Sequence, residues 1–478
     1  MTITIVGLGP GNPEQLTLEA WRTLENATTV LLWSEDHIAI VDLPPGPAYI
    51  KLSEQHEAAG DVGDLYDRLI EAVCAYDDIV FAVPGDPFIF ELTDRIMTRA
   101  AKEGKAVQIV SGMSFIEPTL AALGIVGGAG LQIHQAVLVA EMHHPPFNPD
   151  MPVLLAMVHN TAIAAQIKRI LLNQYPADHQ IYLVYKAGSP LQTVETLSLD
   201  KLDQSPHIGP ATTVYIPPVS RVGSLSSLQE TMSRLRAPDG CPWDREQTHE
   251  TLRPYLLEEA YEVIDAIDAG DTAALCEELG DLLLQVVFHA QVAVENDEFR
   301  MIDVVTAINE KLHRRHPHVW GDVTVNGSAD VTQNWEAIKK QERQDNGKSK
   351  KSLLDGIAQA LPALSQAYSY QVRAARVGFD WDDISGVIEK IVEEIAEIQE
   401  AATPEQRTAE MGDLLFALVN WMRWLDVEPE MALRETNQRF YRRFSTIEQS
   451  ADEQGIPLSE MTLQEMDALW DAAKAQGL

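Results

Sequence analysis

One acidic pattern occurs twice in the second half of this 478-residue chain, and it constrains the fold more than any other feature. In each copy, three glutamates within five residues are followed, after a gap, by the sequence Glu-x-Gly-Asp. Both stretches have the apolar period of an amphipathic helix, in which side chains three residues apart share one face. Two such helices packed antiparallel would point four carboxylates into one small space. The first copy consists of Glu258, Glu259, Glu262, Glu278 and Asp281, and the second of Glu393, Glu394, Glu397, Glu410 and Asp413.

These carboxylates predict a cation. Like charges in one small space repel, so each carboxyl would tend to hold a proton unless a cation lay among them. Hard divalent cations take oxygen ligands, and Mg²⁺ prefers a few carboxylates together with waters and the phosphates of a substrate. The pattern therefore indicates a metal site that receives a phosphorylated ligand.

The two copies also resemble each other downstream of the carboxylates. Each continues with two basic residues four apart on a helical stretch, and then with a Trp followed four residues later by a Lys. Cations suit phosphates and a flat ring suits stacking, so the set indicates a nucleotide. The simpler alternative is a duplicated helical bundle whose second copy has lost its function. The residues are Lys311, Arg315, Trp335 and Lys339 in the first copy, and Arg439, Arg443, Trp470 and Lys474 in the second.

The composition limits the partners. Acidic residues number 72 against 36 Lys and Arg, for a formal charge of −36. This excess argues against nucleic-acid binding, which needs a positive footprint, and against an anionic membrane surface. The sequence has no long apolar run and opens directly on a strand pattern, so we expect neither a membrane span nor a signal peptide. Three scattered cysteines without a CxxC spacing are expected to be reduced, as in a cytoplasmic protein.

The first 218 residues differ from the rest of the chain. Short β-rich runs alternate there with helical patterns, which predicts an α/β domain. After a Pro- and Ser-containing segment at 216–224 the β signal largely disappears, and a polar break at 344–352 divides the helical remainder. We therefore expect domains at 1–218, 226–345 and 353–478. The expected strands lie at 3–7, 79–83, 107–110, 153–156 and 181–185.

Residues 226–478 resemble a tandem protein of the MazG family, the all-α nucleoside triphosphate pyrophosphohydrolases. The resemblance rests on the acidic motifs and on the sequences that begin at Cys241 (CPWD), Arg314 (RRHPHV) and Arg376 (RVGFDW). It implies hydrolysis of (deoxy)nucleoside triphosphates to monophosphate and pyrophosphate with Mg²⁺, or with Mn²⁺ in its place. It also implies a homodimer and a role in clearing aberrant nucleotides.

The same resemblance assigns roles to the residues. It makes metal ligands of Glu259, Glu262, Glu278 and Asp281, and of Glu394, Glu397, Glu410 and Asp413. The basic residues named above would hold phosphates, and the two tryptophans would contact the base or sugar. Glu258 and Glu393 either orient the attacking water or are solvated neighbours. Either one copy or both could hydrolyse the substrate, and the resemblance slightly favours the C-terminal copy as the active one.

In the N-terminal domain, glycine-rich turns follow three of the expected strands. These turns begin at Gly7 (GLGPG), Pro84 (PGDP) and Ser111 (SGMS). Glycine permits tight turns and close approach of a ligand to the backbone, but the spacing is not GxGxxG, which disfavours a nicotinamide site. Together the turns resemble the tetrapyrrole methylase family. The sequence FIFE, which begins at Phe88, differs from that of many family members, in which a Gly often follows the aromatic residue. This difference leaves the methyl acceptor open. The resemblance implies S-adenosylmethionine held by Pro10, Gly85, Asp86, Ile89, Ser114, Phe115 and Met157.

We therefore expect a multidomain, bifunctional enzyme with an N-terminal α/β tetrapyrrole-methylase-like domain followed by two all-α MazG-type repeats, similar to fusion proteins of the YabN type. Two alternatives remain. The chain is either a methyltransferase whose helical half dimerises and senses nucleotides, or a non-catalytic regulator that binds nucleotide or S-adenosylmethionine. For the N-terminal domain taken by itself, the alternative is a domain that binds the cofactor or a regulator without methylating.

Overall fold

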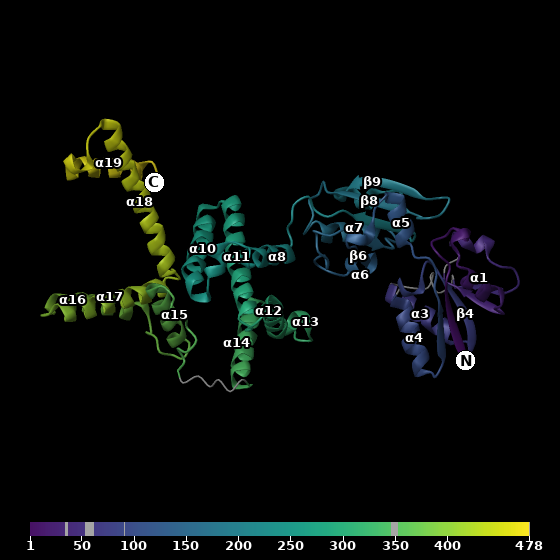
Figure 1. Ribbon diagram of the computed structural model, residues 1–478. Helices are drawn as coiled ribbons and strands as arrows, with labels where there is room; N and C mark the ends of the chain where they lie inside the picture. Colours follow the sequence, from purple (N-terminus) through teal and green to yellow (C-terminus); the bar gives the residue numbers. More distant parts are fainter. Residues whose placement is uncertain (34–36, 53–61, 90, 346–351, 478) are drawn as a thin grey trace. The chain divides into compact units, whose positions relative to one another are not determined.

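The computed structural model describes residues 1–33, 37–52, 62–89, 91–345 and 352–477 (Figure 1). The polar break predicted at 344–352 therefore lies mostly outside the described residues. Contacts divide the chain into two compact units, Met1–Ile308 and Asn309–Leu478. The division into three domains stays a prediction, because the first unit also contains the opening helices of the expected first repeat.

The first sheet is parallel throughout, with strand order β3-β2-β4-β1-β5. Its interior strand β1, between β4 and β5, buries Ile3, Ile5 and Val6 completely, as expected of a parallel strand covered on both faces. The strands are β1 (Thr2–Gly7), β2 (Thr29–Leu32), β3 (Ala48–Lys51), β4 (Asp78–Val83) and β5 (Ala106–Val110). The helices between them are η1 (Pro13–Gln15), α1 (Leu18–Glu25), η2 (Ile38–Asp42), α3 (Val62–Cys74), η3 (Pro87–Ile89) and α4 (Glu91–Lys102).

A second sheet follows, with strand order β6-β7-β10-β8-β9, in which only β6 and β7 pair in parallel. Helix α7 packs its apolar face, including Ile167 and Ile170, into the core that this sheet forms. The strands are β6 (Gln132–Gln135), β7 (Val153–Ala156), β8 (Gln180–Tyr185), β9 (Thr193–Ser198) and β10 (Thr212–Ile216). The helices are α5 (Ile116–Leu123), η4 (Gly127–Ala129), α6 (Ala136–Ala140), α7 (Thr161–Leu171) and η5 (Leu199–Gln204). All five predicted strands are present, and the expected α/β fold is confirmed.

From residue 225 on, the described residues form helices and no strand. The start of this helical part is held by Asp150, whose carboxylate accepts hydrogen bonds from the backbone N–H groups of Gly223 (2.8 Å) and Ser224 (3.1 Å). The first unit contains α8 (Leu225–Arg236), α9 (Pro242–Glu246), α10 (His249–Ala269) and α11 (Thr272–Glu295), and α12 (Met301–Arg315) runs into the second unit. The core here consists of Met232, Leu252, Val287, Phe288 and Val292.

The second unit continues with helices alone among its described residues. None of the described helices of the chain combines the length and apolarity that a membrane span requires. The elements are α13 (Pro317–Trp320), α14 (Ser328–Asp345), α15 (Ala363–Ala375), α16 (Ile384–Glu400), α17 (Pro404–Trp424), α18 (Pro429–Gln454), η6 (Leu458–Glu460) and α19 (Leu463–Ala475).

Candidate functional site

The first acidic motif lies on the helix pair α10–α11. Gly270 ends α10 with φ +65°, a left-handed conformation that glycine adopts easily, and the Asp271 side chain accepts the N–H groups of Ala273 and Ala274 at the start of α11. These two residues reverse the chain. The pair that the sequence predicts is therefore present, with three glutamates of the motif on α10 and Glu278 and Asp281 on α11.

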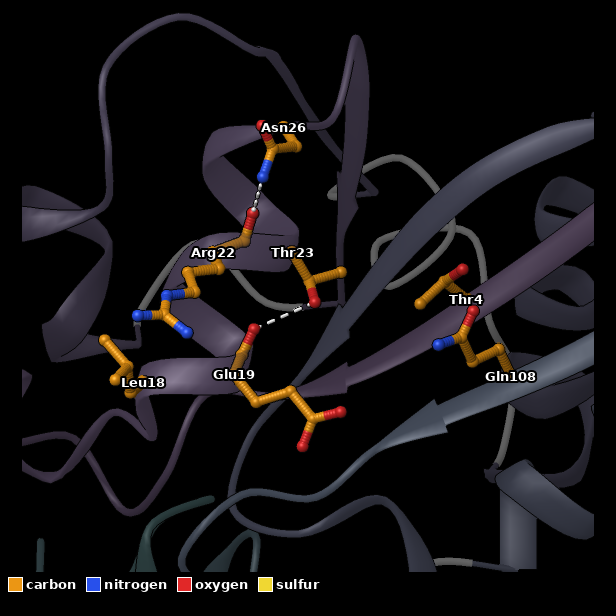
Figure 2. A pocket seen from close by; sticks show the side chains of 7 residues that line it. All are labelled: Thr4, Leu18, Glu19, Arg22, Thr23, Asn26 and Gln108. Carbon is orange, nitrogen blue, oxygen red and sulfur yellow. Dashed lines mark hydrogen bonds between the residues drawn. The ribbon is translucent and has the colours of Figure 1, made fainter.

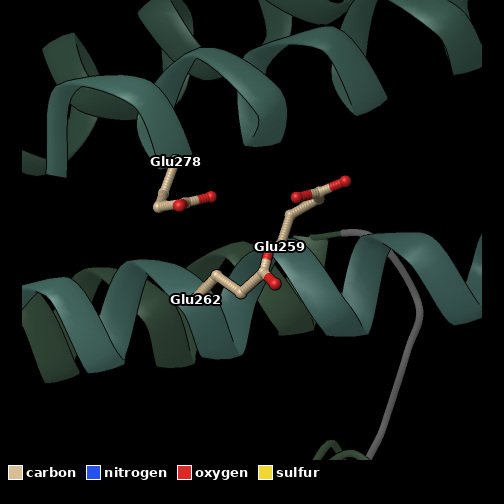
Figure 3. Close-up of side chains that lie close together, drawn as sticks. All are labelled: Glu259, Glu262 and Glu278. Atoms are coloured by element: carbon tan, nitrogen blue, oxygen red, sulfur yellow. The ribbon is translucent and has the colours of Figure 1, made fainter. Parts of the chain in front are cut away.

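Carboxylates from both helices meet (Figure 3). Ligand oxygens of Glu259, Glu262 and Glu278 all lie within 4.8 Å of one another. Burial raises the pKa of Glu259, and the negative charges of Asp281 and Glu262 raise it further. The pKa of Glu278 is raised by burial and then by Glu262 and Asp281. Asp281 therefore belongs to the same electrostatic cluster, whereas Glu258 is exposed beside it.

The second acidic motif lies on α16–α17 and is more buried. Ligand oxygens of Glu394, Glu410 and Asp413 lie within 4.8 Å of one another. Glu394 is only 3% exposed, and its buried Oε2 has no hydrogen-bond partner. Glu397 lies nearby, because burial and then Glu394 raise the pKa of its carboxyl while Lys390 lowers it. The structure thus brings together three of the four residues predicted as ligands of the second copy, and Glu397 is coupled to them electrostatically.

A lysine that the sequence analysis did not single out enters this second cluster. Lys390 Nζ lies 2.7 Å from Glu394 Oε1 and 3.0 Å from Glu393 Oε1. These hydrogen bonds, the one to Glu394 foremost, raise the pKa of Lys390. The signal was present as a Lys three and four residues before the two glutamates, but such spacing is common on solvated helix faces. At the corresponding place in the first copy, four residues before Glu259, stands Tyr255.

The basic and aromatic residues of the first copy come together around Trp335. Lys339 Nζ lies 4.9 Å from the centre of the indole ring, and the Arg315 guanidinium lies 5.8 Å from it. Lys311 lies four residues before Arg315 on α12. A carboxylate that the sequence analysis missed also takes part, since Glu342 binds Arg314 (2.6 Å) and Arg315 (2.7 Å).

In the second copy the corresponding group forms around Trp470. The Arg443 guanidinium lies 5.3 Å from its ring, and the ring of Phe440 lies at the same distance. Arg439 Nη2 donates a hydrogen bond of 2.8 Å to Thr436 Oγ1, and Lys474 is exposed on α19. In the second copy, acidic residues of α16 therefore cluster with those of α17, and Arg443 contacts Trp470.

In the N-terminal half, three turns meet at the carboxyl ends of β4, β1 and β5, which are neighbours in the first sheet. Gly9 and Gly85 exchange backbone hydrogen bonds of 3.2 and 2.8 Å. A Cβ at Gly7 would lie 2.5 Å from Gly85 O, and one at Gly112 would lie closer still. These glycines are therefore required for the turns to touch, and in parallel sheets this edge is where ligands bind.

The predicted cofactor residues lie around these turns. Asp86 links two of them by accepting the N–H groups of Phe88 (2.9 Å) and Gly112 (3.1 Å). Ser114 accepts the N–H of Ile116 at 3.0 Å. Met157 follows β7 with φ +63°, an uncommon conformation for a residue with a side chain. The turn after β1 contains Pro10, and the turn after β4 contains Gly85. The segment after β5 contains Ser114 and Phe115, and Ile89 ends η3.

One further hollow, of about 640 Å³, lies on the first sheet beside α1 (Figure 2). Hydrogen bonds within the helix satisfy some of its polar groups, as between Thr23 Oγ1 and Glu19 O (2.8 Å). None of the predicted site residues lines it. Its lining consists of Thr4, Leu18, Glu19, Arg22, Thr23, Asn26 and Gln108.

Comparison with known proteins separates the same two halves. Residues 2–203 match the tetrapyrrole (corrin/porphyrin) methylases, and residues 247–320 match the MazG nucleotide pyrophosphohydrolase domain. The chain is 40% identical to the uncharacterized protein YabN of Bacillus subtilis (strain 168), over 99% of this chain and 98% of that protein. It is 48% identical to the nucleoside triphosphate pyrophosphohydrolase/pyrophosphatase MazG of Thermotoga maritima, over 52% of this chain and 94% of the relative. A solved uroporphyrin-III-C-methyltransferase from Thermus thermophilus aligns with a TM-score of 0.36 and 21% identity, over 45% of this chain and 91% of that one.

Proposed function

The chain belongs to the MazG family, with a tetrapyrrole methylase domain preceding the MazG domain, and from this premise we propose that it hydrolyses (deoxy)nucleoside triphosphates to monophosphate and pyrophosphate. The pair of carboxylate clusters carries the proposal, since three ligand oxygens in each lie within 4.8 Å of one another. The relative from Thermotoga maritima is named for this activity.

The residues of the clusters fit a hard divalent cation such as Mg²⁺. The carboxylates offer oxygen ligands alone. Burial, and then the negative charges of neighbouring carboxylates, raise the pKa values of Glu259, Glu278 and Glu397, and a bound cation would offset both effects. The buried Oε2 of Glu394 is an acceptor still in need of a partner. When bound, the metal would activate a water and neutralise phosphate oxygens. Its proposed ligands are Glu259, Glu262, Glu278 and Asp281 in the first copy, and Glu394, Glu397, Glu410 and Asp413 in the second.

The remaining residues would position the nucleotide. Guanidinium and ammonium groups bind phosphate oxygens and stabilise the charge that develops on a pyrophosphate leaving group. Each tryptophan carries such a cation on its ring, so its exposed parts can contact the base or sugar while the cation remains near the phosphates. Glu258 and Glu393 are the residues proposed to orient the attacking water. The phosphate-binding residues are Lys311, Arg315 and Lys339, and Arg439, Arg443 and Lys474.

The helical pairs also favour a homodimer. Large apolar side chains remain exposed on them, among them Val392 on α16 (61% exposed) and Leu415 on α17 (55%). Apolar side chains of this size mark an interaction site where they form one patch. We propose that a second copy of the chain covers it. The proposed location of the enzyme is the cytoplasm, where it would act on the nucleotide pool.

For the N-terminal domain the proposed ligand is S-adenosylmethionine. The observation that favours it is the meeting of three glycine turns at the carboxyl edge of a parallel sheet. Gly112→Ala should abolish binding of S-adenosylmethionine in calorimetry, because its Cβ would collide with Gly85 O. Gly128→Ala is the matched control, since a Cβ there meets open space. The methyl acceptor is not specified by these residues.

The hydrolase proposal is tested with the purified full-length chain, Mg²⁺ and a panel of nucleoside and deoxynucleoside triphosphates. Chromatography should show monophosphate and pyrophosphate, and a chelator should stop the reaction. Diphosphate with orthophosphate, or no turnover of any nucleotide, would overturn the proposal.

A further inference from the structure

The two carboxylate clusters differ in one charged residue. On α16, Lys390 lies one turn before Glu394 and binds it at 2.7 Å. On α10 the same place is taken by Tyr255, whose ring packs edge-on against Trp243 with centroids 5.9 Å apart. In the part of the chain that the structure describes, no Lys or Arg forms an ion pair with Glu259, Glu262 or Glu278. The first cluster therefore lacks the internal cation that the second one has.

The burial of Glu394 makes this cation consequential. A carboxylate that is 3% exposed loses most of its hydration and needs a compensating positive charge. Lys390 compensates at Oε1 only, while Oε2 is buried without a partner. Glu410 and Asp413 add their oxygens to the same space. The cluster thus leaves Oε2 as an acceptor for a second cation, which would have an ammonium group close by.

The ammonium group can also move. Lysine has a flexible four-carbon stem, and the side chain of Lys390 is 37% exposed, so it has a route to solvent or to a bound anion. A nucleotide would bring phosphate oxygens next to the metal ligands. Lys390 could then exchange Glu394 for a phosphate oxygen without losing a partner for its charge.

We propose that Lys390 is a tethered cation in the second metal site, so that the two copies take up divalent metal differently. The inference rests on the proposed function, because it assumes that both clusters are metal sites. The first cluster binds metal without nucleotide. The second binds metal weakly until a nucleotide arrives, when Lys390 passes from Glu394 to the phosphates and the metal takes its place.

The test measures Mn²⁺ binding to the full-length chain by electron paramagnetic resonance, with each cluster isolated by a variant of the other. In the Glu262→Gln background only the second cluster remains intact, and Lys390→Tyr should tighten its Mn²⁺ binding by about tenfold, because one positive charge leaves contact distance. In the Glu397→Gln background the reciprocal Tyr255→Lys should weaken the first cluster by about the same factor. A non-hydrolysable triphosphate should narrow the difference between the two clusters in the otherwise unchanged chain.

The outcomes separate the two proposals. Equal Mn²⁺ affinities in the two backgrounds, unaltered by either exchange, would overturn the inference and leave the hydrolase proposal standing. A chain that binds no Mn²⁺ with or without nucleotide would overturn the proposed function itself. If Lys390→Tyr does not fold, Lys390→Met, which keeps most of the apolar stem, and the Tyr255→Lys arm decide the matter.

Discussion

The helix pairs α10–α11 and α16–α17 carry the same acidic pattern but balance its charge in different ways. In the first pair the repulsion among carboxylates is not met by an internal cation among the described residues, and the pKa values of Glu259 and Glu278 are raised. In the second pair Lys390 binds Glu394 directly. The two copies therefore share the acidic pattern and differ in its counter-charge.

The basic residues of the two copies also differ in their carboxylate partners. In the first copy Glu342 binds both Arg314 and Arg315, so that two cations share one carboxylate. The place that corresponds to Glu342 in the second copy, seven residues after the tryptophan, is Gly477, which has no charge. In the first copy one carboxylate is thus shared by two arginines, whereas in the second an ammonium group binds the carboxylate cluster and Arg439 lies 3.6 Å from the more exposed Glu435. If both copies bind nucleotide as proposed, binding would displace a different contact in each.

The largest expected effect comes from removing one ligand from each cluster. Glu262→Gln and Glu397→Gln together should lower pyrophosphate release by roughly 100-fold or more, as loss of metal-site groups typically does. The single variants divide this loss between the copies. If one of them leaves the rate unchanged, the copy it disables is not catalytic, and the comparison becomes one between an active and an inactive site. Circular dichroism of each variant checks that the helices remain folded.

The ligand faces could be predicted from sequence because their cause is local. Residues three apart share a helix face, and Gly270-Asp271 reverses the chain whatever surrounds it. The β-rich runs at 3–7 and 79–83 were likewise long enough to be recognised as strands. Short strands such as β3 (Ala48–Lys51), at the edge of its sheet and largely exposed, have no such pattern.

The counter-charges could not be predicted, because their cause is tertiary. A Lys one turn before a Glu usually forms a weak, solvated ion pair. The burial of Glu394, which the sequence does not reveal, makes this ion pair stronger. Glu342 lies 27 residues from Arg315, and only the packing of α14 brings the two together. The glycine-rich turns could be recognised from their place after strands, but the meeting of Gly7, Gly85 and Gly112 without room for a Cβ is visible only in the fold.

The two tryptophans offer a second way to compare the copies. Trp470→Ala and Trp335→Ala should each weaken nucleotide binding to their own copy by about tenfold, which is the usual cost of losing a stacking ring. Binding is measured with a fluorescent non-hydrolysable triphosphate, in the Glu262→Gln background for Trp470 and the Glu397→Gln background for Trp335. Phenylalanine at either position should restore most of the affinity. An equal loss with Phe and Ala would show that the ring is not the contact.

A smaller effect is expected from Glu342. Glu342→Gln removes the carboxylate that competes with phosphates for Arg314 and Arg315, so nucleotide binding to the first copy should tighten several-fold. The matched control is Glu435→Gln, which removes a more exposed carboxylate, 3.6 Å from Arg439, in the second copy. Weaker binding in Glu342→Gln would mean that the carboxylate positions Arg315 for the substrate and does not compete with it.

The smallest effect concerns stability against acid. Hydrogen bonds from Arg315, and then from Arg314, hold the pKa of Glu342 at about 2 against an ordinary value of 4.5, although burial opposes them. Between these values the unfolded chain binds more protons than the native one, so the contribution of this ion pair to stability is complete above pH 4.5 and is lost as the pH falls towards 2.

Urea denaturation should therefore show that the free energy of unfolding decreases more steeply over this range in the unsubstituted chain than in Glu342→Gln. The difference should be about 1 kcal/mol, because Arg314 is half exposed and its share is screened by solvent. Asp150, whose pKa is also about 2, titrates in both proteins and cancels from the comparison. Parallel curves would mean that the charge on Glu342 stabilises the bound geometry of the arginines and not the fold.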